Sequence, residues 1–372
     1  MPITLDGTNG ITTPSYGGAD TAEYLVPVTQ FKNRIINGAM MIDQRNAGAS
    51  VTVTDTSNLT YTLDRWSAFG SSSSKFSVQQ VSDAPIGFIN SLKITSLAAT
   101  TVNSSDQYTI GQIIEGLNVA DLAWGTANAK TVTLSFWVRS SLTGTFGGVI
   151  VNSGFARGYG FTYSISVADT WEYKTVTVAG DTTGTWLTTN GQGINIRFGL
   201  GVGSTLSAPV GSWSAGSYRS ATGATSVVGT NGATFYITGV QLEVGSTATS
   251  FDYRPYGTEL QLCQRYFQML VSGTGQSIGN FAAYSTTYAN GIIDLHQTMR
   301  VTPTLYQVAS TSYFIAYSAG SGRYFDSLTL QASSKDTVAL YNTSGTIAGA
   351  AGDAVWFTTD NAAVRVGFQA EL

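Results

Sequence analysis

The stretch from Lys130 to Ser141, KTVTLSFWVRSS, alternates between apolar and polar side chains, and this pattern limits the possible folds most strongly. One face of such a segment carries Val132, Leu134, Phe136 and Val138. An alternation of period two predicts a β-strand with one buried face. Similar segments separated by Gly, Ser and Asn turns occur at residues 75–81, 91–97, 108–117, 171–180 and 194–202. Many short alternating strands predict an all-β sandwich.

The segment 235–244, FYITGVQLEV, changes phase in its middle. Phe235 and Ile237 belong to one phase, whereas Val240 and Leu242 belong to the other, and Gly239 lies between them. One extra residue in a strand reverses the alternation, and Gly is the usual occupant of such a bulge. We therefore predict a β-bulge at Gly239 that keeps both halves of the strand facing the core.

The length and composition indicate two β-domains. The chain has 372 residues, of which 42 are Gly, 12% are aromatic and only 11% are charged. Pro255 cannot donate to a sheet and follows the predicted bulged strand, so a domain boundary is expected near residues 256–258. A second series of strand-like segments runs from residue 262 to the end. The first 32 residues are rich in Gly and Thr, which is typical of a flexible tail or of an arm that becomes ordered only against a partner.

Several classes of protein are excluded or disfavoured. A net charge of −4 and the absence of any Lys/Arg run disfavour a nucleic-acid binder. No apolar run is long enough to span a bilayer, and the N-terminal residues lack the pattern of a secretory signal. One Cys and one His, Cys263 and His296, rule out a disulfide framework and a Cys/His metal site. No nucleotide-binding loop is present, so no cofactor is predicted.

Four motifs carry a resemblance: NRIINGAMMIDQRNAG…YTLDRW, TVTLSFWVRSSLTG, ATFYITGVQLEVGSTATSFDYRPYGTELQLCQRYF and the terminal FQAEL. From about residue 30 to the end, the chain resembles tail-fibre and related receptor-binding proteins of tailed bacteriophages. Residues 33–256 are similar to jelly-roll carbohydrate-binding modules. The family phrase usually has an aromatic residue where this chain has Met40 and Met41, and QRNAG replaces the usual QRG.

The resemblance implies a domain order and a function. It predicts a virion-attachment arm over residues 1–32, a jelly roll over 33–256 and a smaller C-terminal β-sandwich over 257–372. It implies a homotrimeric fibre of the phage tail that binds a host-surface polysaccharide without cleaving it and contacts other virion proteins through its arm. A head-attached fibre or decoration protein is an alternative. Jelly-roll modules of this kind often carry a structural calcium ion, whose ligands the sequence does not single out.

Sugar recognition requires flat aromatic faces and planar polar groups. The polar phases of three predicted strands supply Trp137, Arg139, Trp171, Tyr173 and Arg197. If these strands pair, their outward face forms a shallow sugar-binding cleft. In the alternative interpretation, Trp137 packs under a loop or against another subunit, and the Arg side chains form surface ion pairs of little energetic value.

The C-terminal domain carries aromatic residues in Ser- and Gly-rich segments. Its candidate receptor-contacting residues are Tyr284, Tyr288, Tyr317 and Tyr324. Such segments on a β-scaffold form adaptable recognition surfaces. The same residues are also compatible with a trimer axis.

A glycan-depolymerising spike is the enzymatic alternative. It requires two carboxylates that flank a glycosidic bond. The 22 acidic residues are scattered, and the repeats typical of β-helical depolymerases are absent. His296 lies two residues after Asp294, but no nucleophile motif accompanies them, so His296 is interpreted as a surface or interface residue. We therefore predict a binding protein and not an enzyme.

Overall fold

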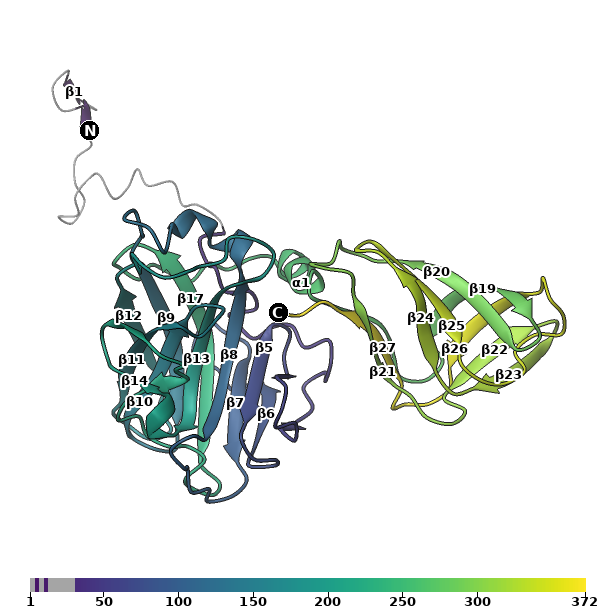
Figure 1. Ribbon diagram of the computed structural model, residues 1–372, viewed down its shortest axis with the longest axis horizontal. Coiled ribbons are helices and arrows are strands. Elements are labelled where there is room, and N and C mark those ends of the chain that lie inside the picture. The colour runs from purple at the N-terminus through teal and green to yellow at the C-terminus, as the bar shows by residue number, and fades with distance from the viewer. Residues whose placement is uncertain (1–3, 7–9, 13–30) are drawn as a thin grey trace.

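The computed structural model describes residues 4–6, 10–12 and 31–372, and it shows two β-sandwiches joined through one helix (Figure 1). Most of the predicted arm, residues 1–32, lies outside the described residues. Within it, β1 (Thr4–Asp6) pairs antiparallel with β2 (Gly10–Thr12). Among the described residues, no helix is long and apolar enough to cross a membrane.

The first sandwich is a jelly roll of two antiparallel sheets, here called the seven-stranded sheet and the six-stranded sheet. The seven-stranded sheet has the order β15 (Trp213–Ala215), β11 (Arg157–Ile165), β10 (Gly144–Val151), β13 (Gln192–Val202), β8 (Gln107–Glu115), β5 (Trp66–Gly70) and β4 (Thr60–Tyr61). The six-stranded sheet has the order β12 (Glu172–Val178), β9 (Val132–Ser140), β17 (Thr234–Val244), β7 (Ser91–Ser96), β6 (Phe76–Val81) and β3 (Val51–Thr52). Two short strands, β14 (Ser207–Ala208) and β16 (Ser220–Ala221), pair in parallel, and short 3-10 helices span Gly116–Asn118, Ala120–Leu122 and Ser204–Leu206.

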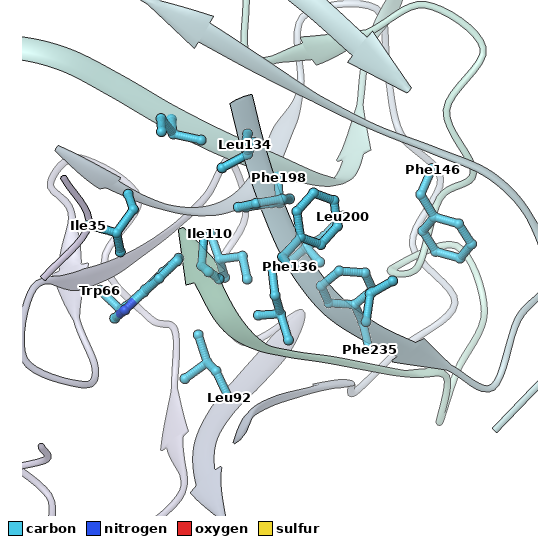
Figure 2. Packing of buried hydrophobic residues seen from close by; sticks show 14 of the residues in the cluster. Ile35, Trp66, Leu92, Ile110, Leu134, Phe136, Phe146, Phe198, Leu200 and Phe235 are labelled. Atoms are coloured by element: carbon cyan, nitrogen blue, oxygen red, sulfur yellow. The ribbon is translucent and has the colours of Figure 1, made fainter. Parts of the chain in front are cut away.

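One continuous apolar core fills the space between these sheets (Figure 2). The predicted inner face of β9 is confirmed, because Val132, Leu134, Phe136 and Val138 are all fully buried. The Phe136 ring lies edge-on to Phe198 of the opposite sheet, with centroids 5.1 Å apart. Burial of each large side chain stabilises the fold by about 1.5–3 kcal/mol. The apolar face of β9 therefore packs against the apolar face of the opposite sheet.

The bulge predicted in β17 is present at Gly239. The pairing of β17 with β9 shifts register between Thr238 and Gln241, and Gly239 has a φ of 60°. Val240 and Leu242 beyond the bulge are fully buried, as are the apolar residues before it. Both halves of the strand therefore contribute to the core.

The helix α1 (Tyr256–Gln264) leads into the first strand of the second sandwich. Its small sheet has the order β18 (Phe267–Ser272), β27 (Arg365–Gln369) and β21 (Thr304–Val308). Its large sheet has the order β23 (Ser321–Phe325), β22 (Phe314–Ser318), β26 (Ala354–Thr359), β19 (Ser277–Ser285), β20 (Tyr288–Asp294), β25 (Thr337–Asn342) and β24 (Leu328–Ser333). A separate apolar core, which includes Phe281, Phe314 and Phe357, lies within this domain.

The C-terminus returns to α1 between the two sandwiches (Figure 1). There, a small apolar cluster contains Ile36 and Ile42 of the first domain together with Cys263 and Tyr266 of the second. Burial raises the pKa of the Cys263 thiol well above its usual value, so this cysteine is an inert packing group. The segment LCQRYF is thus the joint between the domains.

Candidate functional site

Two aromatic side chains form a platform on the outer face of the six-stranded sheet. Trp137 of β9 lies directly opposite Tyr173 of β12, and their ring centroids are 5.3 Å apart at an interplanar angle of 49°. Trp137 is half-buried and Tyr173 is exposed. The strand alternation places both on the face away from the core, as the sequence predicts.

Gly239 of β17 lies buried beneath this platform, and it has no side chain. A Cβ atom at Gly239 would lie 2.6 Å from Phe88 and 3.1 Å from Trp137. The positive φ of Gly239 also disfavours any other residue. The bulge at Gly239 keeps both halves of β17 facing the core. Because Gly239 has no side chain, it also leaves the space that the rings of Phe88 and Trp137 occupy.

The loop after β17 supplies the opposite wall. Phe251 and Tyr253 of this loop pack with Phe88 of the β6–β7 loop, at centroid distances of 5.1 and 5.5 Å. The hydroxyl group of Tyr253 donates to the carbonyl oxygen of Gly87. The wall is thus built from two loops that contact each other through aromatic rings and one hydrogen bond.

Buried polar groups hold this loop in place from beneath. The Glu243 carboxylate accepts hydrogen bonds from the backbone N–H and the hydroxyl of Thr249, at 2.8 and 2.6 Å. Gln241 accepts a hydrogen bond from the backbone N–H of Asp252 at 2.8 Å. Because these hydrogen bonds tie the loop to buried side chains of β17, the wall is ordered before any ligand arrives.

Together these elements enclose a groove of about 550 Å³. It is lined by Phe88, Ser135, Trp137, Tyr173, Gly239, Ala248, Thr249, Ser250, Phe251 and Tyr253. Phe88, Phe251 and Tyr253 also line an adjoining pocket of about 170 Å³. Aromatic rings and small hydroxyl-bearing side chains suit a ligand that has flat C–H faces and hydroxyl groups.

Arg139 and Trp171 do not line the groove, and Arg139 is already engaged by other residues. The Arg139 guanidinium donates to both carboxylate oxygens of Asp83, at 2.5 and 3.1 Å. It also lies over the rings of Tyr236 and Trp171, 4.1 and 5.5 Å from their centroids. The predicted role of Arg139 as a free sugar-binding guanidinium is therefore not supported by its contacts.

The sequence-based placement of Arg197 in the same cleft is wrong. Its strand, β13, belongs to the seven-stranded sheet, whereas Trp137 and Tyr173 lie on the six-stranded sheet. Arg197 does point away from the core, but it is only 8% exposed. The alternation within a strand sets which face a side chain takes, but it does not determine which sheet the strand joins.

Two aromatic groups lie on the outer face of the large C-terminal sheet. Tyr317 and Trp356 are paired across β22 and β26, with centroids 5.4 Å apart, and both are partly exposed. Tyr284 is 80% exposed and contacts Tyr288 at 6.1 Å. Tyr324 is also exposed. Sequence reasoning missed Trp356, although its place in the alternating segment AVWFTT would have assigned it to the outer face.

Acidic residues line the adjoining pocket, where Asp252 and Glu259 lie, but not the groove itself. Among the described residues that line the groove, none is a carboxylate. Across the described chain, no group of three or more His, Cys, Asp or Glu residues could hold a metal ion, so the side chains offer no carboxylate cluster for the calcium ion that the resemblance allows. His296 is exposed at the end of β20, as its surface interpretation predicts.

No family model matches this sequence, and no curated protein matches it. Several solved structures share parts of its fold. A family 11 carbohydrate-binding module from Clostridium thermocellum, in complex with a β-1,3-1,4-mixed-linked tetrasaccharide, has 12% identity and a TM-score of 0.28 over 54% of this chain and 98% of its own. The enzymatically active domain of tailspike protein 4 of bacteriophage CBA120 has 13% identity and a TM-score of 0.29 over 59% of this chain.

The match covers only 22% of that tailspike chain. A third structure, TmCBM61 in complex with β-1,4-galactotriose, has 10% identity and a TM-score of 0.26, and the match covers 48% of this chain and 88% of its own. Likenesses of this level concern the β-sandwich fold and carry no information on what this chain binds.

Proposed function

We propose that this protein is a non-catalytic glycan-binding protein that serves as a tail fibre of a tailed bacteriophage and adsorbs the particle to host-surface polysaccharide. The observation that carries the glycan-binding part is the groove between Trp137, Tyr173 and the Phe88–Phe251–Tyr253 wall. Its floor and wall are fixed by a bulge and by buried hydrogen bonds, so the binding surface exists before the ligand arrives.

The chemistry of the groove favours a neutral saccharide. Aromatic faces at Trp137 and Tyr173 can stack on sugar rings, and the small polar residues Ser135 and Ser250 line the same groove. Because no described lining residue is acidic, cleavage by a pair of carboxylates is disfavoured in this groove.

The phage part of the proposal is supported by the sequence motifs. Some of the residues that carry them, Arg65, Arg265 and Glu371, form ion pairs at the joint between the domains. We propose a homotrimer in which residues 1–32 attach to other virion proteins and the two sandwiches face outward. Several weak sugar sites on one particle would together give firm adhesion.

Glycan-array binding tests the proposal. Wild-type protein is compared with Trp137→Ala and with Trp356→Ala, a matched change of an exposed tryptophan in the other domain. We expect selective loss of signal with Trp137→Ala. Loss with Trp356→Ala alone would move recognition to the C-terminal tip, and the absence of any wild-type signal on a broad array would contradict glycan binding.

The assembly and the attachment arm have separate tests. Light scattering of the purified chain should give the mass of three chains, whereas a monomer would contradict an autonomous fibre. Deleting residues 1–30 should abolish incorporation into particles while leaving the two sandwiches folded. Immunogold labelling of particles would distinguish a tail fibre from a head-attached fibre.

A further inference from the structure

A second polar cluster lies on the outer face of the seven-stranded sheet, opposite to the groove. Its central residue is Arg197 of β13, which is only 8% exposed. Its guanidinium makes one hydrogen bond, a contact of 3.3 Å from Nη1 to the hydroxyl of Thr109. Its Nε–H is buried and has no partner among the described residues. The side chain is therefore a buried charge with most of its donors unused.

A second guanidinium stands close to the first. Arg219 lies over the Phe155 ring at 3.8 Å from its centroid, and Arg197 lies 5.2 Å from the same centroid. Arg219 donates to the hydroxyl of Ser217 and to a backbone carbonyl oxygen, both of which are neutral. Two positive charges thus share one aromatic ring.

Neither guanidinium has a counter-ion in the part of the chain that the structure describes. The ion pairs of this region involve other arginines, such as Arg157 with Asp181. Burial first, and then the charge of Arg219, lower the pKa of Arg197 to about 10. It still carries its charge at neutral pH. A buried charge without a partner is strongly unfavourable, and contact with one ring offsets only part of that cost.

The surrounding atoms complete a set of donors. Among the described residues, the buried hydroxyl of Ser220 has no partner, and it lies close to the position that a Cβ of Gly199 would take, two residues beyond Arg197. The side-chain amide of Asn195, two residues before Arg197 on the same face, also lacks a partner for its N–H groups. Phe155 adopts a positive φ of 51°, which is rare for an aromatic residue. The structure thus maintains a strained residue over two unneutralised charges.

We propose that Arg197, Arg219 and Ser220 form a binding site for an oxyanion. The ligand chemistry is a carboxylate, sulfate or phosphate group, either free or as a substituent of an acidic saccharide. Guanidinium groups bind such planar or tetrahedral anions with paired, charge-assisted hydrogen bonds. The site is independent of the aromatic groove, because it lies on the other sheet and recognises charge and not a sugar face.

Calorimetric titration and thermal unfolding test the site. The probes are sodium phosphate, sodium sulfate and sodium glucuronate, with glucose as the neutral control and chloride used to keep ionic strength constant. We expect the anions to bind and to raise Tm by mass action, and glucose to do neither. A preference for glucuronate over the inorganic ions would indicate an acidic saccharide, and the reverse order would indicate a free anion.

Variants locate the binding. Arg219→Gln, at a half-buried position, should weaken anion binding at least about tenfold. Arg365→Gln is the matched control, because Arg365 also lacks a carboxylate partner but lies in the other domain and donates only to carbonyl oxygens. Arg197→Met should abolish the anion-dependent rise in Tm and, without anion, should unfold no earlier than the wild type, since it removes an uncompensated charge.

Three results would overturn the proposal. The first is the absence of any anion-dependent heat or Tm change at millimolar concentrations. The second is equal binding by the wild type and Arg219→Gln. The third is a loss of Tm in anion-free buffer for Arg197→Met as large as for a core truncation, because the charge would then be compensated already within the fold.

Discussion

Arg65 of the first sandwich donates a hydrogen bond across the domain junction to the carboxylate of Glu371, the penultimate residue of the chain. The side chains are 1% and 8% exposed. Arg65 also lies 3.6 Å from the centroid of the Tyr266 ring, and Arg45 contacts the same carboxylate at 3.2 Å. Residues of the motifs LDRW, QRNAG, QRYF and AEL therefore meet in one buried joint, although they are widely separated in the sequence.

Glu371→Gln should uncouple the two domains. It leaves Arg65 and Arg45 buried without their counter-ion, which costs about 3–5 kcal/mol for a buried pair. Scanning calorimetry should resolve a lower-melting transition that is absent from the wild type. Glu172→Gln is the matched control, because its partner Lys174 forms a surface pair worth at most about 1 kcal/mol. Equal melting curves for both variants would contradict a structural joint.

The same joint should weaken in acid through Glu115. Burial acts to raise the pKa of Glu115, but hydrogen bonds from Arg265 and Tyr266 outweigh it and hold the pKa below its usual value of 4.5. A carboxyl group with a depressed pKa stabilises the fold above its unfolded pKa, and this contribution is lost as pH falls through the folded value. Glu115→Gln should flatten the fall of Tm below about pH 4.5. If Tm of the variant fell with pH as steeply as Tm of the wild type, other carboxylates would account for the loss of stability in acid.

The contribution of Asp64 to stability should change with pH in the opposite direction to that of Glu115. Complete burial raises its pKa to about 6, against the charge of Arg45 and hydrogen bonds from Gln44. The folded state therefore binds a proton more tightly than the unfolded state, and the contribution of Asp64 to stability falls as pH rises from about 4 to about 6. Asp64→Asn should remove this slope from urea unfolding measured over that range, whatever it does to the baseline. A slope that persists in the variant would assign it to another group.

Gly239→Ala should damage both the sheet and the groove. The positive φ costs about 1 kcal/mol, and the Cβ contacts with Phe88 and Trp137 add to it. Gly232→Ala isolates the first effect, because Gly232 has a φ of 77° with nothing within 4 Å of its Cβ position. In chemical unfolding, Gly239→Ala should lose more stability than Gly232→Ala. In ligand titration, only Gly239→Ala should bind more weakly than the wild type. Similar loss of stability and unchanged binding in both would remove Gly239 from the account of the groove.

The sequence is sufficient to predict the strands whose alternation is regular. The clean pattern of residues 132–140 and the phase change at Gly239 predict β9, its buried face and the bulge. Strands β10 and β11 are less apparent, because glycines such as Gly148 and Gly160 interrupt the alternation. In the structure these positions lie against other backbone and side-chain atoms that a Cβ would strike.

The groove is only half predictable. The strand alternation predicts that Trp137 and Tyr173 lie on the outer face. They come together because β9 and β12 are neighbours in the sheet. Phe88 and Phe251 do not, because they lie in loops whose approach depends on Gln241 and Glu243 beneath them. Arg197 was misplaced for a related reason, since strand order in a sandwich is set by long-range pairing that alternation does not encode.

The central claim is that the groove on the six-stranded sheet binds a saccharide through Trp137. The most direct measurement is the calorimetric Kd of a responsive oligosaccharide for the wild type and for Trp137→Ala, with circular dichroism and Tm as checks of folding. The account predicts a Kd at least about tenfold weaker in the variant, or about 1.4 kcal/mol, with an unchanged Tm. An unchanged Kd in a folded Trp137→Ala protein would contradict it.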